Sequence, residues 1–252
     1  MTSRKTFTLV ACLLVAFAGM AFGDEVAEKG RAVFEANKDA VVTVRSVVSL
    51  SFGGEENERE SWANGTIVDE SGLTVVALSF LDPTQLFKAM GRDMGDMGSK
   101  VVSLNIVLPD GTEIPAEEAI RDKDLDLALL RPIEQPGQPM PHVDLENAAE
   151  PQMLDQLAIL AQLGEVARRA HSVMVERVES IVEKPLKYFV IGEHRMQSVL
   201  SSPAFTMDGA FVGIGTMRAI KSKSEGGRGD NILVIIVPAA KLKDAVAQVP
   251  EK

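Results

Sequence analysis

Three serines precede a proline in the stretch SVLSSPAFTMDGAFVGIGT, which covers residues 198–216. Ser198, Ser201 and Ser202 are therefore candidate nucleophiles for the hydrolysis of a peptide bond. A serine hydroxyl is a weak nucleophile until a neighbouring base, in most enzymes a histidine, takes its proton. Whether these serines can do chemistry depends on whether the chain supplies such a base.

The chain has three histidines, His142, His171 and His194, and they are widely separated. The single cysteine, Cys12, lies near the N-terminus, so no histidine has a Cys or a second His at metal-ligand spacing. Residues 87–100 contain three Met-Gly pairs, whose thioethers could hold Cu(I). Without His or Cys alongside, a flexible loop that makes adaptable apolar contacts is the favoured interpretation. The sequence therefore predicts no metal and no cofactor.

Residues 1–23 have the pattern of a secretory signal peptide. Arg4 and Lys5 precede an apolar run at 7–22, and Gly23 stands directly before two acidic residues. A retained membrane anchor is the alternative, but it needs roughly 20 apolar residues. We expect cleavage near Gly23, export to the periplasm or the extracellular space, and no stable membrane insertion afterwards.

The chain that remains after cleavage, residues 24–252, is strongly acidic. Loss of Arg4 and Lys5 leaves 24 Lys and Arg against 36 Asp and Glu, a formal charge of −12. Such a charge repels phosphate backbones, so we expect no nucleic-acid partner. The mature chain has no cysteine and must fold without disulfides, and its 229 residues are enough for one large or two small domains.

Short runs of β-branched residues alternate with tight turns, which predicts an all-β fold of sandwich or barrel type. Strands are expected at residues 40–52, 66–80 as two strands around a turn, 103–114 as a hairpin, 172–182, 187–191, 204–216 and 232–237. A helical segment is expected at 24–37, and Pro238 begins a closing helix. Residues 53–61 and 221–230 are expected to be solvated loops. Residues 151–170 favour a helix by propensity, although they lie among strands.

Several of these segments resemble the HtrA (Deg) family of trypsin-like serine proteases. The similar segments are ANGTIVDESGLTVVALSFL at 63–81, VLPDGTEIPAEEAIRDKDLDLALLRPI at 107–133 and PAFTMDGAFVGIGT at 203–216. The resemblance implies a trypsin-like double β-barrel with short N-terminal and C-terminal helices. The first barrel would cover 38–135 and the second, with the C-terminal helix, 136–252. The resemblance also implies a strand within 151–163, and we expect no peptide-binding PDZ domain after the second barrel.

In this family a serine attacks the peptide carbonyl, a histidine takes its proton and an aspartate orients the histidine. The resemblance places the aspartate at Asp126. It places the histidine at Ser79 and the nucleophile at Leu200, while Ser198 and Val199 fall in the loop that forms the oxyanion hole. No intact triad is therefore expected, because a serine hydroxyl cannot act as a base near neutral pH.

Ser201 is the fallback nucleophile, one residue beyond Leu200. It and Ser202 replace two glycines of the family, which adds Cβ atoms where the backbone needs positive φ. His171 and His194 are the remaining candidate bases, but both follow Asp126 in the chain, unlike the family histidine. Without its histidine, Asp126 is expected to be a structural carboxylate that accepts backbone N–H bonds.

The expected function is that of a catalytically inactive, exported protein that binds or scaffolds polypeptide through a cleft or an exposed strand edge. Ser79, Leu200, Ser201 and Trp62 are expected in or near a cleft between the barrels, with residues 87–100 covering it or touching a partner. Two alternatives stay open. One is an active serine endopeptidase with displaced catalytic residues, and the other is a purely structural subunit of the cell envelope.

Overall fold

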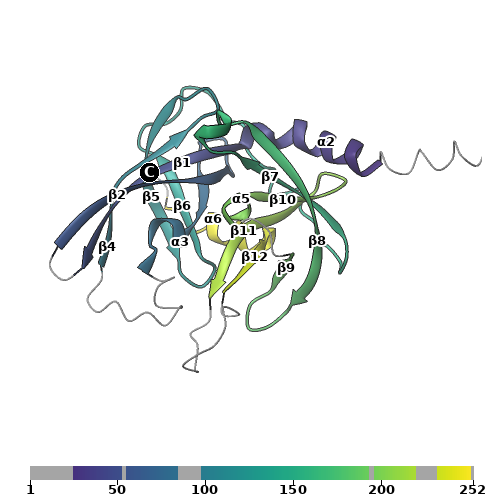
Figure 1. Cartoon of the computed structure of the whole chain (residues 1–252). Coiled ribbons are helices and arrows are strands. Elements are labelled where there is room, and N and C mark those ends of the chain that lie inside the picture. Colours follow the sequence, from purple (N-terminus) through teal and green to yellow (C-terminus); the bar gives the residue numbers. More distant parts are fainter. Residues whose placement is uncertain (1–24, 53–54, 85–97, 193–195, 220–231, 251–252) are drawn as a thin grey trace, which may run out of the picture.

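The computed structural model describes residues 25–52, 55–84, 98–192, 196–219 and 232–250. They form two closed antiparallel barrels of six strands each, with a helix before the first strand and another after the last (Figure 1). The fold is therefore all-β, a trypsin-like double barrel with short terminal helices, and this prediction is confirmed. The expected signal peptide and the loop at 221–230 lie outside the described residues, as do most of the Met-Gly segment and His194.

The first barrel has the strand order β1-β2-β3-β6-β5-β4. Its strands are β1 (Val41–Phe52), β2 (Glu55–Ile67), β3 (Thr74–Ala77), β4 (Gly98–Val107), β5 (Glu113–Asp122) and β6 (Leu127–Pro132). Alternating apolar side chains fill its interior, among them Val42, Val44, Ile67, Val76, Ile106 and Leu130. This alternation is the period-2 pattern that placed most of these strands from the sequence.

The second barrel has the strand order β10-β11-β12-β9-β8-β7. Its strands are β7 (Gln156–Gln162), β8 (His171–Val182), β9 (Tyr188–Ile191), β10 (Pro203–Thr206), β11 (Phe211–Ala219) and β12 (Ile232–Pro238). Its interior contains Leu157, Ile159, Phe189, Val199, Val212 and Ile236. The two barrels repeat one topology with different side chains.

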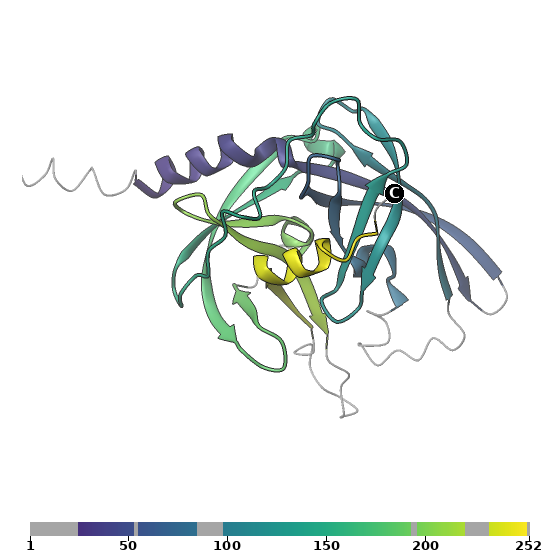
Figure 2. The same cartoon turned by 180° about the vertical axis from the view of Figure 1, so that it is seen from behind.

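A third apolar cluster joins the barrels. Val75 and Leu129 of the first barrel pack with Leu160 and Ile214 of the second. Helices α2 (Glu25–Asn37) and α6 (Ala239–Val246) contribute buried side chains to the same cluster, and Figure 2 shows α6 lying against both barrels from behind. Residues from the two barrels that meet at the candidate site are therefore supported by one continuous apolar core.

Four short helical turns complete the part of the chain that the structure describes. They are η1 (Lys38–Ala40), α3 (Leu78–Leu81), η2 (Glu165–Ala167) and α5 (Met196–Val199). The second strand expected within 66–80 ends earlier than predicted, at Ala77, because α3 begins there. No helix of the described ranges combines the length and the apolar character needed to cross a membrane.

Two expectations from local sequence were wrong. Residues 55–61 were expected in a solvated loop but belong to β2, which pairs with β1 from Phe52↔Glu55 to Val41↔Thr66. Their side chains are polar and mostly exposed, so the strand comes from pairing and not from burial. Within 151–170, propensity favoured a helix, but Gln156–Gln162 is the strand that the family resemblance implied, because its apolar residues are buried between two strand neighbours.

Candidate functional site

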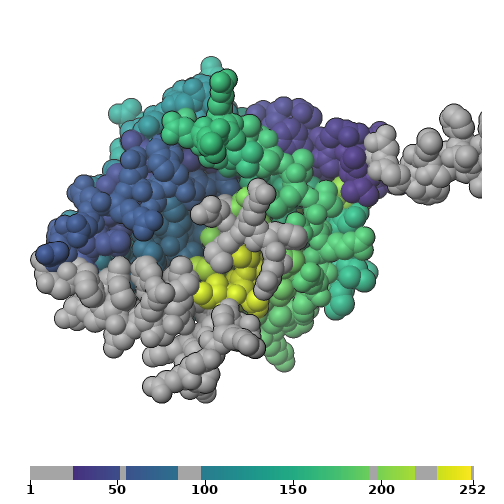
Figure 3. Space-filling view, in the orientation of Figure 1, coloured from purple at the N-terminus to yellow at the C-terminus, as the bar shows by residue number. Residues whose placement is uncertain are grey.

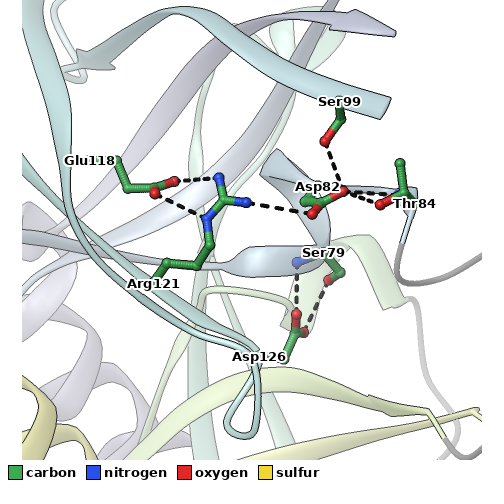
Figure 4. A network of polar contacts seen from close by, with 7 residues as sticks. All are labelled: Ser79, Asp82, Thr84, Ser99, Glu118, Arg121 and Asp126. Atoms are coloured by element: carbon green, nitrogen blue, oxygen red, sulfur yellow. Dashed lines mark hydrogen bonds and ion pairs between the residues drawn. The ribbon is translucent and has the colours of Figure 1, made fainter. Parts of the chain in front are cut away.

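Ser79 and Asp126 lie side by side in the first barrel. Ser79 sits in α3 directly after β3, and Asp126 precedes the first residue of β6. The backbone N–H of Ser79 donates to Asp126 Oδ1 at 2.7 Å, and its hydroxyl donates to Oδ2 at 3.0 Å (Figure 4). The structure thus brings together two of the three positions that the resemblance assigned to the triad.

Asp126 also links the first barrel to the second. The N–H of Met217 in β11 donates to Asp126 Oδ2 at 2.9 Å, and the N–H of Leu78 donates to the Asp126 carbonyl at 2.9 Å. Burial raises the pKa of Asp126 to about 6, although the N–H groups of Met217 and Ser79 and the Ser79 hydroxyl each act to lower it. With three donors on its side chain, the carboxylate serves as a structural bridge.

The Ser79 hydroxyl is not available to accept a proton from a nucleophile. Its one hydrogen is donated to Asp126. A hydroxyl oxygen that accepted a second proton would become a strong acid, which general base catalysis near neutral pH excludes. The pair can therefore hold α3 in place but cannot activate a serine.

Ser201, the fallback nucleophile, is completely buried. Its hydroxyl oxygen accepts the N–H of Ala77 at 2.8 Å, its N–H donates to the Gly215 carbonyl at 2.7 Å, and its carbonyl accepts the hydroxyl of Thr66 at 2.8 Å. Its φ is 64°, the left-handed conformation that glycine adopts more easily. Ser201, at a position where the resemblance implies a glycine, is thus tied into the junction between the barrels and has no exposed surface.

Ser202 belongs to a second buried network at the same junction. Asn64 in β2 donates from Nδ2 to Ser202 Oγ at 3.2 Å, and Asn64 Oδ1 accepts the N–H of Gln162 at 2.9 Å. The Ser202 hydroxyl donates to the Ser198 carbonyl at 2.9 Å, and Thr43 donates to the side-chain oxygen of Gln162. These contacts cross from β1 and β2 to β7 and α5, so polar residues hold the two barrels in register.

Leu200 and Val199 make the position of the expected nucleophile apolar. Leu200 is half-buried, and Val199 contributes its side chain to the interior of the second barrel. The carbonyl of Val199 lies so close to Gly215 that a Cβ at that glycine would come within 1.9 Å of its oxygen. The segment equivalent to the oxyanion loop is therefore packed directly onto β11.

The two described histidines each lie within hydrogen-bond distance of a backbone carbonyl oxygen. His171 Nε2 is 3.0 Å from the carbonyl oxygen of Val41, and His142 Nδ1 is 2.9 Å from that of Met140. Neither forms a hydrogen bond with Ser79, Ser198 or Ser201 in the part of the chain that the structure describes. Within that part, no three His, Cys, Asp or Glu side chains gather in an arrangement suited to a metal ion.

A polar cluster that the sequence analysis missed lies beside α3. Asp82 is buried and accepts from the Thr84 N–H and hydroxyl and from the Ser99 hydroxyl, while Arg121 forms an ion pair with it at 3.5 Å (Figure 4). Burial acts to raise the pKa of Asp82, but the hydrogen bonds and Arg121 outweigh it and hold the pKa below the ordinary value. The spacing Asp82-Pro-Thr84 is an Asx-turn signal that could have located this anchor of α3.

Trp62, which was expected in or near a cleft with the serines, is exposed, whereas Ser201 is buried. Trp62 is 46% exposed, and two guanidinium groups lie near its ring, that of Arg45 in β1 at 5.8 Å and that of Arg169 in the second barrel at 5.3 Å from the ring centroid. Arg45 also forms ion pairs with Glu60 and Glu113. The tryptophan thus marks an outer surface where the two barrels meet.

Comparisons of the sequence with models of known protein families and with curated proteins found no match. The assignment of a family therefore stays a proposal that rests on the similar segments and on the double-barrel fold.

Proposed function

We propose that this chain is an exported, HtrA-like member of the trypsin fold that has no peptidase activity and binds polypeptide. The observation that carries the proposal is the pairing of Ser79 with Asp126. At the position where this fold requires a proton acceptor, the side chain is itself a proton donor. The junction has the carboxylate of Asp126 but, at Ser79, no side chain that can act as a base.

The neighbouring groups do not replace what is missing. Leu200 has no nucleophilic atom, and the Ser201 hydroxyl is buried and occupied by the N–H of Ala77. Loss of triad members lowers the rate of a serine hydrolase by several orders of magnitude. A displaced active site in the described part of the chain would need a reactive serine beside a histidine, and the geometry supports none.

The polypeptide-binding part of the proposal rests on the sheets. An extended peptide can join an open sheet edge as a further strand and bind through its main-chain hydrogen bonds. Closed barrels have no free edge along their closed part. The β1–β2 hairpin extends beyond that part, since β2 pairs with β3 only at Thr66 and Ile67. The fold therefore offers a main-chain binding surface without requiring catalysis.

The proposal is tested by incubating the purified protein with fluorescein-labelled unfolded casein and, separately, with a fluorophosphonate serine probe. We expect a saturable rise in the anisotropy of the casein, no fragments and no labelled protein, and the same result for Ser201→Ala. A folded globular protein with the same label should not bind, and active trypsin provides the positive control for cleavage and labelling.

Cleavage and labelling that disappear in Ser201→Ala would show a rebuilt hydrolase and overturn the proposal. Absence of both cleavage and casein binding would overturn the polypeptide-binding part and leave a structural role for the fold.

A further inference from the structure

Strand β2 is hydrogen-bonded on one side only over most of its length. It pairs with β1 from Glu55 to Thr66, whereas β3 pairs with it only at Thr66 and Ile67. Within the described ranges no strand pairs with its other edge at residues 55–65. Figure 1 shows the β1–β2 hairpin extending away from the body of the first barrel, and Figure 3 shows the blue segment that includes β2 at the surface.

The outer half of this strand has a regular row of charges. Alternate residues of a strand share a face, so Glu56, Glu58, Glu60 and Trp62 follow one another on one side. The three glutamates are exposed. Glu60 forms an ion pair with Arg45 at 3.3 Å, but Glu56 and Glu58 form none with any described residue. The open edge therefore carries two carboxylates that have no ion-pair partner among the described residues.

A second copy of this chain does not fit the same edge. Antiparallel pairing of β2 with itself, centred on Glu58, would place Glu58 opposite Glu58 and Glu56 opposite Glu60. Like charges directly opposite each other destabilise a strand pair. Charged residues on an edge strand are a known means of blocking such association. The same row attracts a strand of opposite charge, and the acidic chain as a whole, with a net charge of −10, favours the same partner.

The outer parts of β2, β1 and β4 form an arm of three paired strands, and its other edge, on β4, is less suited to a partner. β4 pairs with β1 from Gly98 to Val107, and its outer edge pairs with β5 from Leu104 onwards. Near its free end, the Ser99 hydroxyl is held by Asp82 at 2.8 Å, and Lys100 is its charged residue. Of the two edges, β2 is the longer one and the only one with a row of carboxylates within the described residues.

We propose that the edge of β2 at Glu55–Ser61 binds an extended segment of a partner polypeptide with alternating Lys or Arg, which joins the sheet as an added strand. This inference rests on the proposed polypeptide-binding function and names its site and its partner class. Main-chain hydrogen bonds provide affinity, and the basic side chains facing Glu56 and Glu58 set the register. Trp62, next in the same row, offers a half-exposed ring to an apolar side chain of the partner.

The test uses the full chain and a labelled peptide of the pattern Lys-Val-Lys-Thr-Lys-Val-Lys-Thr. Binding is followed by peptide anisotropy and by the emission of Trp62, which is the only tryptophan of the sequence. The matched probes are the charge-inverted peptide with Glu in place of Lys and the same Lys peptide with alternate main-chain nitrogens methylated. Unfolded casein is measured in parallel as the general test of polypeptide binding.

The variant is Glu56→Lys/Glu58→Lys, and its control is Glu134→Lys/Glu179→Lys, which makes the same change of net charge at exposed positions outside β2. We expect the first variant to bind the Lys peptide at least about ten-fold more weakly and to gain affinity for the Glu peptide. The control variant should bind like the wild type at the same salt concentration. The methylated peptide should bind weakly to the wild type, and the Trp62 emission should change only with the unmethylated Lys peptide.

Equal loss of affinity in both variants would show a general charge effect and overturn the assigned edge. Casein binding without Lys-peptide binding would overturn the partner class while the proposed function stands. Tight binding of the methylated peptide would overturn strand addition. Absence of binding to every probe would remove the proposed function as well.

Discussion

The junction between the two barrels and the outer half of β2 contain similar polar residues but use them in opposite ways. At the junction, Asn64, Ser201 and Asp126 form hydrogen bonds to partners far away in the sequence. On the outer half of β2, Glu56 and Glu58 are exposed on a strand that is paired on one side. A buried polar group without a partner costs about 1–3 kcal/mol, so the junction residues are committed to structure. The comparison teaches that the polar groups of the junction are engaged in structural hydrogen bonds, whereas those of the outer half of β2 remain exposed at the surface, where the proposed binding would take place.

The largest expected effect is at Gly215 of β11, which packs against the segment that leads to Ser201. In Gly215→Ala the new Cβ would lie 1.9 Å from the Val199 carbonyl oxygen, so the backbone must move. We expect the free energy of unfolding to fall by at least about 3 kcal/mol, measured by urea denaturation. Gly164→Ala is the control, because a Cβ there meets nothing within 4 Å and should change stability by less than about 0.5 kcal/mol.

Two asparagines of the same strand provide the next test of the comparison. Asn64→Ala removes the acceptor of the Gln162 N–H and the donor to Ser202, so we expect a loss of about 2–3 kcal/mol of unfolding free energy. Asn57 lies on the exposed half of β2, so Asn57→Ala should change the free energy of unfolding by less than about 0.5 kcal/mol. Similar losses for both variants in chemical denaturation would contradict the division between junction and arm.

The pKa of Asp126 makes the junction sensitive to pH. Burial raises it from 3.8 to about 6, so between these values the folded chain holds a proton that the unfolded chain has released. Asp126 therefore stabilises the fold most below about pH 4, and this contribution is lost as the pH rises through about 6, by up to about 3 kcal/mol in total. The measurement is the difference in unfolding free energy between the wild type and Asp126→Asn at pH 4, 5, 6 and 7. A difference that does not change with pH would refute the shifted pKa.

The smallest effect is expected where the arm meets the second barrel. Arg169→Gln removes one of the two cations on the Trp62 ring, which should lower the free energy of unfolding by about 0.5 kcal/mol. The emission of Trp62 should change in the same variant, since the charge next to the indole is lost. Arg168→Gln, at the preceding position and with the same positive φ, should leave the emission unchanged if Arg169 is the residue that contacts the ring.

Much of the barrel architecture could be predicted from local sequence. The strands rich in Val, Ile and Leu were found from their apolar pattern, and the turn at Gly111, with a φ of 89°, was found from its Asp-Gly pair. The outer half of β2 could not be found in this way, because EENERES has neither β-branched residues nor alternation. Its strand conformation depends on the hydrogen bonds that β1 supplies.

The candidate site was also predicted in part. The order of the segments led to Ser79 and Asp126, and the structure places these two in contact. The sequence could not predict the burial of Ser201 or the position of Trp62 near arginines of both barrels. Each depends on residues more than a hundred positions away. The Asx turn at Asp82 could have been predicted from the local sequence, whereas the ion pair between Asp82 and Arg121 could not.

By itself, the sequence determined that the positions which the family resemblance assigns to a triad carry Ser79, Asp126 and Leu200, and therefore neither a histidine nor a serine at the two places where that chemistry would need them. Only the tertiary structure decided what the remaining polar residues do. Burial and the supply of donors and acceptors are properties of neighbours in space, so Asp126 and Ser201 became part of the barrel junction while the polar half of β2 became an open edge.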